Sequence, residues 1–269
     1  MKSIVGVLLI AAASLNAGTL PELNEKPWVG WFAGSKNRDF YFGVKNDGEG
    51  AFVLADRNGE MGSSRLTLVF QPVIEEVLPS GRVVTKETLI DGWEPITEAS
   101  EQAELISYRG TVTGGARFEV HFEIEKGEIR GGGRILEKGE LTENPIRFSL
   151  RIRFPNTYPY QRDEEQIEDE ASDDRIQFER ADEKKLKFDA WEPVWAEKED
   201  VSGPGVQRAR IELSTYDGGR FELEAGEQGL FEFYNGSLRP LYKGFTFGWK
   251  PDPEKDPEGT GRFVFEFKP

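Results

Sequence analysis

Strict alternation of apolar and polar residues marks the stretch Arg117-Phe118-Glu119-Val120-His121-Phe122-Glu123-Ile124-Glu125. Successive side chains on a β-strand point to opposite faces, so this stretch predicts a strand with one buried face and one charged face. The same alternation recurs in residues 146–154, 208–213, 220–224 and 262–268. A sheet with one solvated face is typical of antiparallel architecture, because parallel sheets that are covered on both faces have continuous apolar runs.

Short glycine-containing segments separate these stretches. Asn46-Asp47-Gly48, Arg57-Asn58-Gly59, Lys126-Gly127 and Asn235-Gly236 are typical of tight turns between strands. The sequence has no convincing amphipathic helix. It therefore predicts an all-β fold, built as an antiparallel β-sandwich or barrel.

The charged faces of two predicted strands carry opposite charges. Glu119 and Glu123 alternate along one strand, and Arg147 and Arg151 alternate along another. Opposite charges on adjacent strands stabilise a sheet, so these two rows are candidates for cross-strand ion pairs.

Three short patterns occur twice. Asp91-Gly92-Trp93-Glu94-Pro95 returns as Asp189-Ala190-Trp191-Glu192-Pro193, and the Arg-Phe-Glu of 117–119 returns at 220–222, both after about 100 residues. The segment 40–47 returns at 245–252, after about twice that distance. We therefore expect two similar β units from an internal duplication. They span 18–139 and 140–269, the second with an acidic insertion at 163–174 and a closing C-terminal hairpin.

The first residues are typical of a signal peptide. Lys2 precedes the apolar stretch 4–13, which is too short to cross a bilayer, and Ser14 and Ala17 are candidate last residues of a removed peptide. We assign 1–17 to this signal peptide. Export without any cysteine points to a bacterial periplasm or exterior. No later segment reaches 18 apolar residues, so no transmembrane segment is expected in the mature chain.

The composition argues against several functional classes. The chain has no cysteine and a single histidine, which disfavours thiolate or imidazole metal sites and histidine-based triads. A net charge of -15 disfavours nucleic-acid binding, which depends on Lys and Arg. No glycine-rich phosphate loop is present, so no cofactor is expected. Segment 163–174 could offer carboxylates to calcium but lacks an Asp-x-Asp-x-Asp-Gly frame, so an exposed mobile loop is expected and no metal site is assigned.

Tryptophans near predicted strand ends suggest a function. Aromatic rings at the ends of a β-sandwich can form a platform on which sugars stack, and they can equally plug the ends of the core. The candidate ligand-binding residues are Trp93, Glu94, Trp191, Glu192, Trp195 and Trp249. The leading hypothesis is an exported, non-catalytic β-sandwich protein that binds a glycan or another envelope component.

Two alternatives to this hypothesis stay open. Carboxylates beside aromatic rings could cleave polysaccharide, since glycoside hydrolysis uses a pair of Asp or Glu residues. A purely structural subunit of the envelope is the second alternative. The sequence identifies no catalytic residue and leaves the oligomeric state open.

Overall fold

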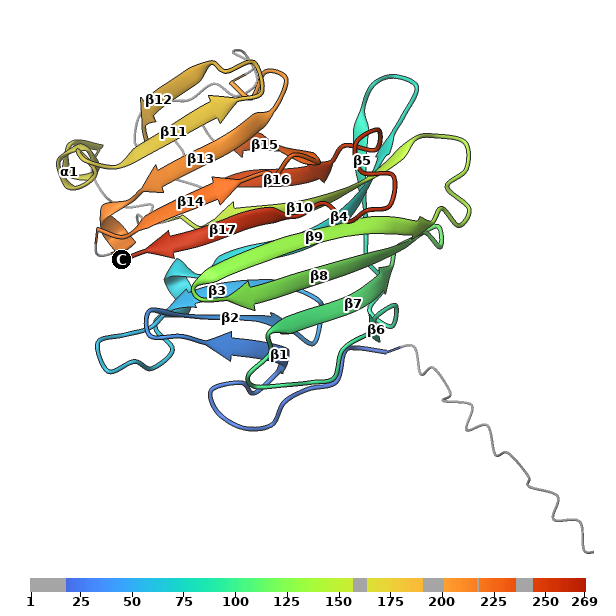
Figure 1. Cartoon of the computed structure of the whole chain (residues 1–269), viewed down its shortest axis with the longest axis horizontal. Coiled ribbons are helices and arrows are strands. Elements are labelled where there is room, and N and C mark those ends of the chain that lie inside the picture. Colours follow the sequence, from blue (N-terminus) through green and yellow to red (C-terminus); the bar gives the residue numbers. More distant parts are fainter. Residues whose placement is uncertain (1–17, 157–163, 191–200, 217, 236–243) are drawn as a thin grey trace, which may run out of the picture.

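A computed structural model describes residues 18–156, 164–190, 201–216, 218–235 and 244–269 (Figure 1). The predicted signal peptide lies outside these ranges, as do Trp191, Glu192 and Trp195. The described chain is nearly all antiparallel β-structure, which confirms the predicted fold class. None of its helices is long and apolar enough to cross a membrane.

Seventeen strands and a few short helical turns make up the described chain. The first nine strands are β1 (Trp31–Lys36), β2 (Phe40–Lys45), β3 (Gly50–Leu54), β4 (Leu68–Val77), β5 (Val83–Lys86), β6 (Glu94–Pro95), β7 (Leu105–Thr111), β8 (Arg117–Glu125) and β9 (Glu128–Glu137). The others are β10 (Ile146–Phe154), β11 (Arg175–Arg180), β12 (Lys185–Asp189), β13 (Val206–Glu212), β14 (Arg220–Glu224), β15 (Gly229–Asn235), β16 (Phe245–Pro251) and β17 (Phe263–Lys268). The helical elements are η1 (Ser64–Leu66), α1 (Glu164–Glu170) and η2 (Ser214–Tyr216).

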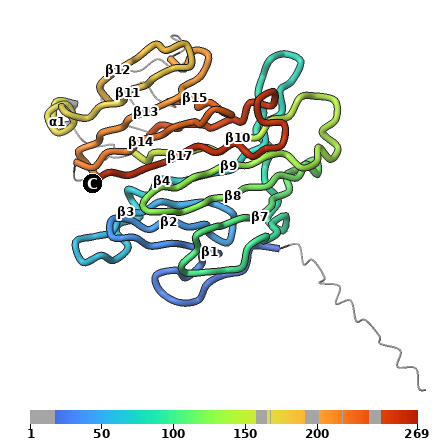
Figure 2. The backbone as a smooth tube through the Cα atoms, viewed as in Figure 1, coloured from blue at the N-terminus to red at the C-terminus, as the bar shows by residue number. Residues whose placement is uncertain are grey.

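The strand pairings form one continuous sheet that folds back into two layers. Sheet A has the order β12-β11-β13-β14-β17-β9-β8-β7-β6. Sheet B has the order β1-β2-β3-β4-β10-β16-β15, with β5 beside β4. Among the described strands, the pair Val206 with Phe231 joins the two sheets. Figure 2 shows the strand β17 between β14 and β9, so β17 joins the two halves of sheet A.

Aromatic side chains fill the space between the two sheets. Phe42 of β2 meets Phe122 of β8 with ring centroids 5.1 Å apart, and Phe154 of β10 meets Phe221 of β14 at 5.3 Å. Their edge-to-face geometry adds specific ring contacts to the burial of apolar area. All four rings are fully buried and belong to one hydrophobic cluster that runs through both layers.

The period-two patterns map directly onto strands. Stretches 117–125, 146–154 and 220–224 coincide with β8, β10 and β14. In β8 the residues Phe118, Val120 and Phe122 are buried and Glu123 is exposed. Three of the predicted turns also form: Gly48 has φ 76°, Gly59 has φ 73° and Gly127 has φ 93°, a backbone conformation that side chains with a Cβ disfavour. The fourth, Asn235-Gly236, includes a residue outside the described ranges.

The internal duplication is not confirmed. The repeated segments around 117–119 and 220–222 lie in β8 and β14, two strands of the same sheet A. The segments 40–47 and 245–252 contribute β2 and β16, both in sheet B. All four strands share the one hydrophobic cluster. The structure therefore shows one layered fold, and the boundary between residues 139 and 140 remains a prediction.

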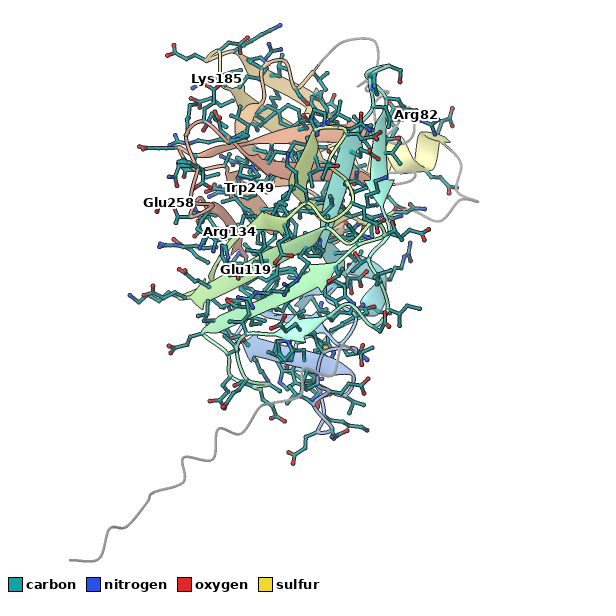
Figure 3. The ribbon with its side chains drawn as sticks, turned by 90° about the vertical axis from the view of Figure 1, so that its right-hand side faces the viewer. Arg82, Glu119, Arg134, Lys185, Trp249 and Glu258 are labelled. Atoms are coloured by element: carbon teal, nitrogen blue, oxygen red, sulfur yellow. The ribbon has the colours of Figure 1, made fainter. Side chains whose placement is uncertain are left out.

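The predicted ion-pair rows do not face each other. Glu119 lies on sheet A, where it pairs with Arg109 at 3.2 Å and with Arg134 at 3.7 Å (Figure 3). Arg147 and Arg151 lie on sheet B and pair with Glu75. Alternation fixes which face of a strand a residue occupies, but it does not fix which strand lies beside it.

The acidic segment 163–174 also departs from expectation. Residues 164–170 form the helix α1 instead of a loop. Ala171 after the helix is fully buried in the core cluster, and Asp174 is 1% exposed, so the described end of this segment is anchored. Asp174 accepts a hydrogen bond from the backbone N–H of Ser214 at 2.6 Å. Among the described residues, no group of three or more His, Asp or Glu side chains could hold a metal ion.

Candidate functional site

Two of the predicted ligand-binding tryptophans lie in the core. Trp249 is fully buried, and its Nε1–H donates to the carbonyl of Ala225 at 2.9 Å. Trp93 is 6% exposed and packs against Tyr108 and Phe118, with centroid distances of 5.7 Å and 5.9 Å. Stacking on a sugar needs an exposed ring face, so these two indoles stabilise the sandwich as packing residues.

Glu94 belongs to an ion-pair network on sheet A. Its carboxylate contacts Arg109 at 3.3 Å and Arg117 at 3.1 Å, and Arg117 also contacts Glu137 at 3.1 Å. These contacts join β6, β7, β8 and β9. Glu94 is therefore a cross-strand ion-pair partner. Among the described residues, the largely exposed aromatic ring is that of Tyr234 on sheet B, so no aromatic platform is described beside this carboxylate.

His121, the single histidine, is buried on the outer face of β8. It is 7% exposed, and its Nε2 has no hydrogen-bond partner in the described chain. Burial, with added repulsion from Arg262 and Arg134, lowers the pKa of His121 to about 3. The imidazole is therefore neutral near pH 7, and it is not poised to exchange protons there.

An exposed aromatic ring marks a different location. In the described part of the chain, Tyr234 on β15 is the one aromatic residue that is largely exposed, at 58%. It lines a cleft of about 540 Å³ on the outer face of sheet B. We take this outer-face cleft as the candidate site. Its walls come from β4, β10, β15 and β16 and from the segment entering β16.

Strand register arranges the cleft side chains in two rows. In one row Arg153, Thr246 and Tyr234 lie side by side on β10, β16 and β15. The next row holds Gln71, Arg151, Gly248 and Glu232, from β4 to β15. All of these residues occupy outward positions because their neighbours along each strand point into the core.

A buried carboxylate holds the cationic side of the cleft in place. Glu75 has a side chain only 6% exposed and contacts Arg147 at 2.8 Å, Arg151 at 2.9 Å and Lys250 at 3.5 Å. Burial alone would raise the pKa of Glu75, but the three cations outweigh it and hold the pKa below its usual value. Glu75 is thus an anion that fixes Arg151 and Lys250, and Lys250 also binds the exposed Glu232.

The floor of the cleft is open because Gly248 has no side chain. A Cβ there would lie 3.2 Å from Ser149 Oγ and 3.9 Å from Arg151 Cγ. The buried Ser149 hydroxyl has no hydrogen-bond partner among the described residues. Such a group is usually satisfied by ordered water or by a bound molecule, so the floor offers polar chemistry beside the aromatic wall.

A larger hollow, of about 660 Å³, lies on the outer face of sheet A. Its charged side chains neutralise one another: Arg208 pairs with Glu224 at 3.0 Å, and Lys185 pairs with Glu179 at 3.7 Å. Phe178, the aromatic residue in its described lining, is 3% exposed. This hollow offers a ligand no ring face, so the cleft on sheet B is the better candidate.

The cleft could not be predicted from the sequence, because its residues form no distinctive pattern along the chain. Tyr234 sits in an ordinary alternating strand, and Glu75 follows the apolar residues 73 and 74. One signal was available: in Phe231-Glu232-Phe233-Tyr234-Asn235 the outward position beside Glu232 carries a ring where a polar residue is expected.

The fold and the cleft define an antiparallel β-sandwich with a charged cleft on one outer face and an aromatic wall. No protein-family model matches the chain, and no curated protein matches it either. Among solved structures, the chain is similar to the alpha-N-acetylgalactosaminidase NagBb from Bifidobacterium bifidum. The TM-scores are 0.52 for its Gal-NHAc-DNJ complex and 0.47 for its GalNAc complex, with 12% identity in both cases.

The similarity covers 87% of this chain and 35% of the NagBb chain, so the chain spans about a third of that enzyme. At this identity the likeness supports the β-fold alone. These structural neighbours are glycoside hydrolases, and the part that matches this chain is a minor share of their length.

Proposed function

We propose that the protein binds a glycan in the outer-face cleft of sheet B without cleaving it. One observation carries this proposal: Tyr234 exposes its ring beside a set of polar side chains that Glu75 holds in place. Sugars bind through an aromatic ring on their apolar face and through hydrogen bonds from fixed polar groups to their hydroxyls. A site that is held in place before binding loses less entropy on association.

Hydrolysis is the alternative with a specific observation behind it. Lys250 contacts both Glu75 and Glu232, so two carboxylates flank one ammonium group. A glycosidase pair needs one carboxyl whose raised pKa lets it act as an acid. The pKa of Glu75 is lowered instead, which favours binding over cleavage. Release of reducing sugar that disappears in Glu232→Gln would reverse this conclusion.

Replacing Tyr234 with alanine should weaken glycan binding about 30-fold, because loss of a central tyrosine typically costs about 2 kcal/mol at an interface. Tyr234→Phe keeps the ring and should stay within about threefold of the wild type if stacking dominates. A glycan array that includes N-acetylgalactosamine glycans would identify the ligand, and calorimetry would give the affinities. Equal affinities for Tyr234→Ala and the wild type would exclude this cleft.

Export of the protein to the bacterial periplasm or exterior is part of the proposal, and it rests on residues 1–17. N-terminal sequencing of protein from its native host should give a first residue between 15 and 18 of the printed sequence. A mature chain that begins at Met1 in the cytoplasm would contradict export. Such a protein would not encounter an envelope glycan.

A further inference from the structure

The charge of the cleft is opposite in sign to that of the protein. Arg151, Arg153 and Lys250 line it together with two carboxylates, Glu75 and Glu232, which leaves one net positive charge. The whole chain carries a net charge of -15. A cationic cleft on an acidic protein concentrates anions locally, while the rest of the surface repels them.

The three cations differ in their ion pairs. Arg151 and Lys250 are held by Glu75, and Lys250 also by Glu232. Arg153 is exposed and forms no ion pair with any residue in the described part of the chain. Its planar guanidinium therefore keeps its paired N–H donors available, and these match the two oxygens of a carboxylate or sulfate.

The position of Arg153 relates it to the aromatic wall. Arg153 and Tyr234 both lie in register with Thr246, one strand to either side of it. Neighbouring strands are about 4.8 Å apart, so the two backbones are separated by about 10 Å. A sugar ring stacked on Tyr234 fits within this span, and an anionic substituent on it or on the adjoining sugar comes within reach of Arg153.

We infer that the cleft selects acidic glycans, with the sugar ring on Tyr234 and its carboxylate or sulfate paired with Arg153. This inference rests on the proposed function, because it names the class of glycan that the same cleft binds. Lys250 and Arg151 add positive potential but stay engaged by Glu75. Specificity for the anion therefore depends mainly on Arg153.

The test compares acidic polysaccharides with their neutral counterparts. Polygalacturonate, alginate and hyaluronate are each arrayed beside the carboxyl-reduced form, and dextran sulfate is arrayed beside dextran. The wild type should bind acidic members over their neutral partners, and binding should weaken as salt screens the exposed charges. If the preference for the acidic member is largest in a carboxylate pair, the recognised anion is a carboxylate. If it is largest in the sulfate pair, the anion is a sulfate.

Variants of Arg153 test the assignment to one side chain. Arg153→Gln should weaken binding of the preferred acidic polysaccharide about 10- to 100-fold, the value of a hydrogen bond between charged groups. Arg153→Lys keeps the charge but loses the paired N–H donors, so its affinity should lie between those of the wild type and Arg153→Gln. Arg82→Gln removes the same charge from the exposed turn between β4 and β5 and should bind like the wild type (Figure 3).

The outcomes separate the two proposals. Equal binding of acidic and neutral members would overturn the selection of acidic glycans while leaving glycan binding intact. The same holds if Arg153→Gln binds acidic polysaccharide like the wild type. Absence of binding to every glycan on the array would overturn both. Unchanged thermal unfolding of Arg153→Gln, checked by circular dichroism, shows that a loss of binding is not a loss of folding.

Discussion

Replacing Trp249 with alanine is expected to lower the free energy of unfolding by about 3–5 kcal/mol. The indole is fully buried against Phe263, with ring centroids 5.8 Å apart. Its removal leaves a large cavity between the sheets and also removes the donor to the Ala225 carbonyl. Urea denaturation followed by tryptophan fluorescence and by circular dichroism would measure the change.

Tyr234→Ala is the matched control for Trp249→Ala. Tyr234 is 58% exposed, so its truncation should change stability by no more than about 0.5 kcal/mol. The two variants thus separate the roles of the aromatic residues: Trp249 should affect stability, and Tyr234 should affect binding. A Trp249→Ala protein as stable as the wild type would mean that this indole is not a core residue, and it would restore Trp249 as a candidate for ligand contact.

Glu75→Gln is expected to cost about 2–4 kcal/mol of stability, because it leaves Arg147, Arg151 and Lys250 around a neutral group. The cost should lie towards the lower end of that range, since the two arginines are 34–40% exposed and water compensates them in part. Glu232→Gln is the matched control. Glu232 contacts the same Lys250 but is 55% exposed, so its loss should be nearly neutral.

The effect of Glu75 should depend on pH. Its pKa is lower in the folded protein than the ordinary value of 4.5, so the folded state binds fewer protons as the pH falls through that range. Its stabilisation is therefore fully present above pH 4.5 and is lost as the pH falls through the lower folded value. The stability difference between wild type and Glu75→Gln should shrink on acidification. A difference that stays constant down to the acid transition would contradict the ion-pair assignment.

Local alternation was sufficient to predict five strands of this fold, namely β8, β10, β13, β14 and β17. In β8 and β10 every second residue is apolar, and those residues are buried in the core between the sheets or packed against it. The turn glycines were equally predictable, since Gly48 and Gly127 adopt the positive φ that a tight turn requires. These features depend on neighbouring residues in the chain, which a sequence displays directly.

The arrangement of the strands was not predictable in the same way. Glu119 and Arg147 have matching patterns and opposite charges, yet they lie on different sheets. The site was missed for the same reason, because Glu75, Arg153 and Tyr234 meet only through the pairing of β4, β10, β16 and β15. Tryptophan was a misleading guide, since Trp93 and Trp249 combine large apolar area with one polar atom and are buried in the core.

A crystal structure of the protein with the tightest-binding oligosaccharide from the array would show directly where the glycan binds. We expect density for a sugar ring on the face of Tyr234, above Gly248, with polar contacts from the side chains that Glu75 holds. An oligosaccharide bound instead in the hollow on sheet A, near Arg208 and Glu222, would contradict the assignment of the site.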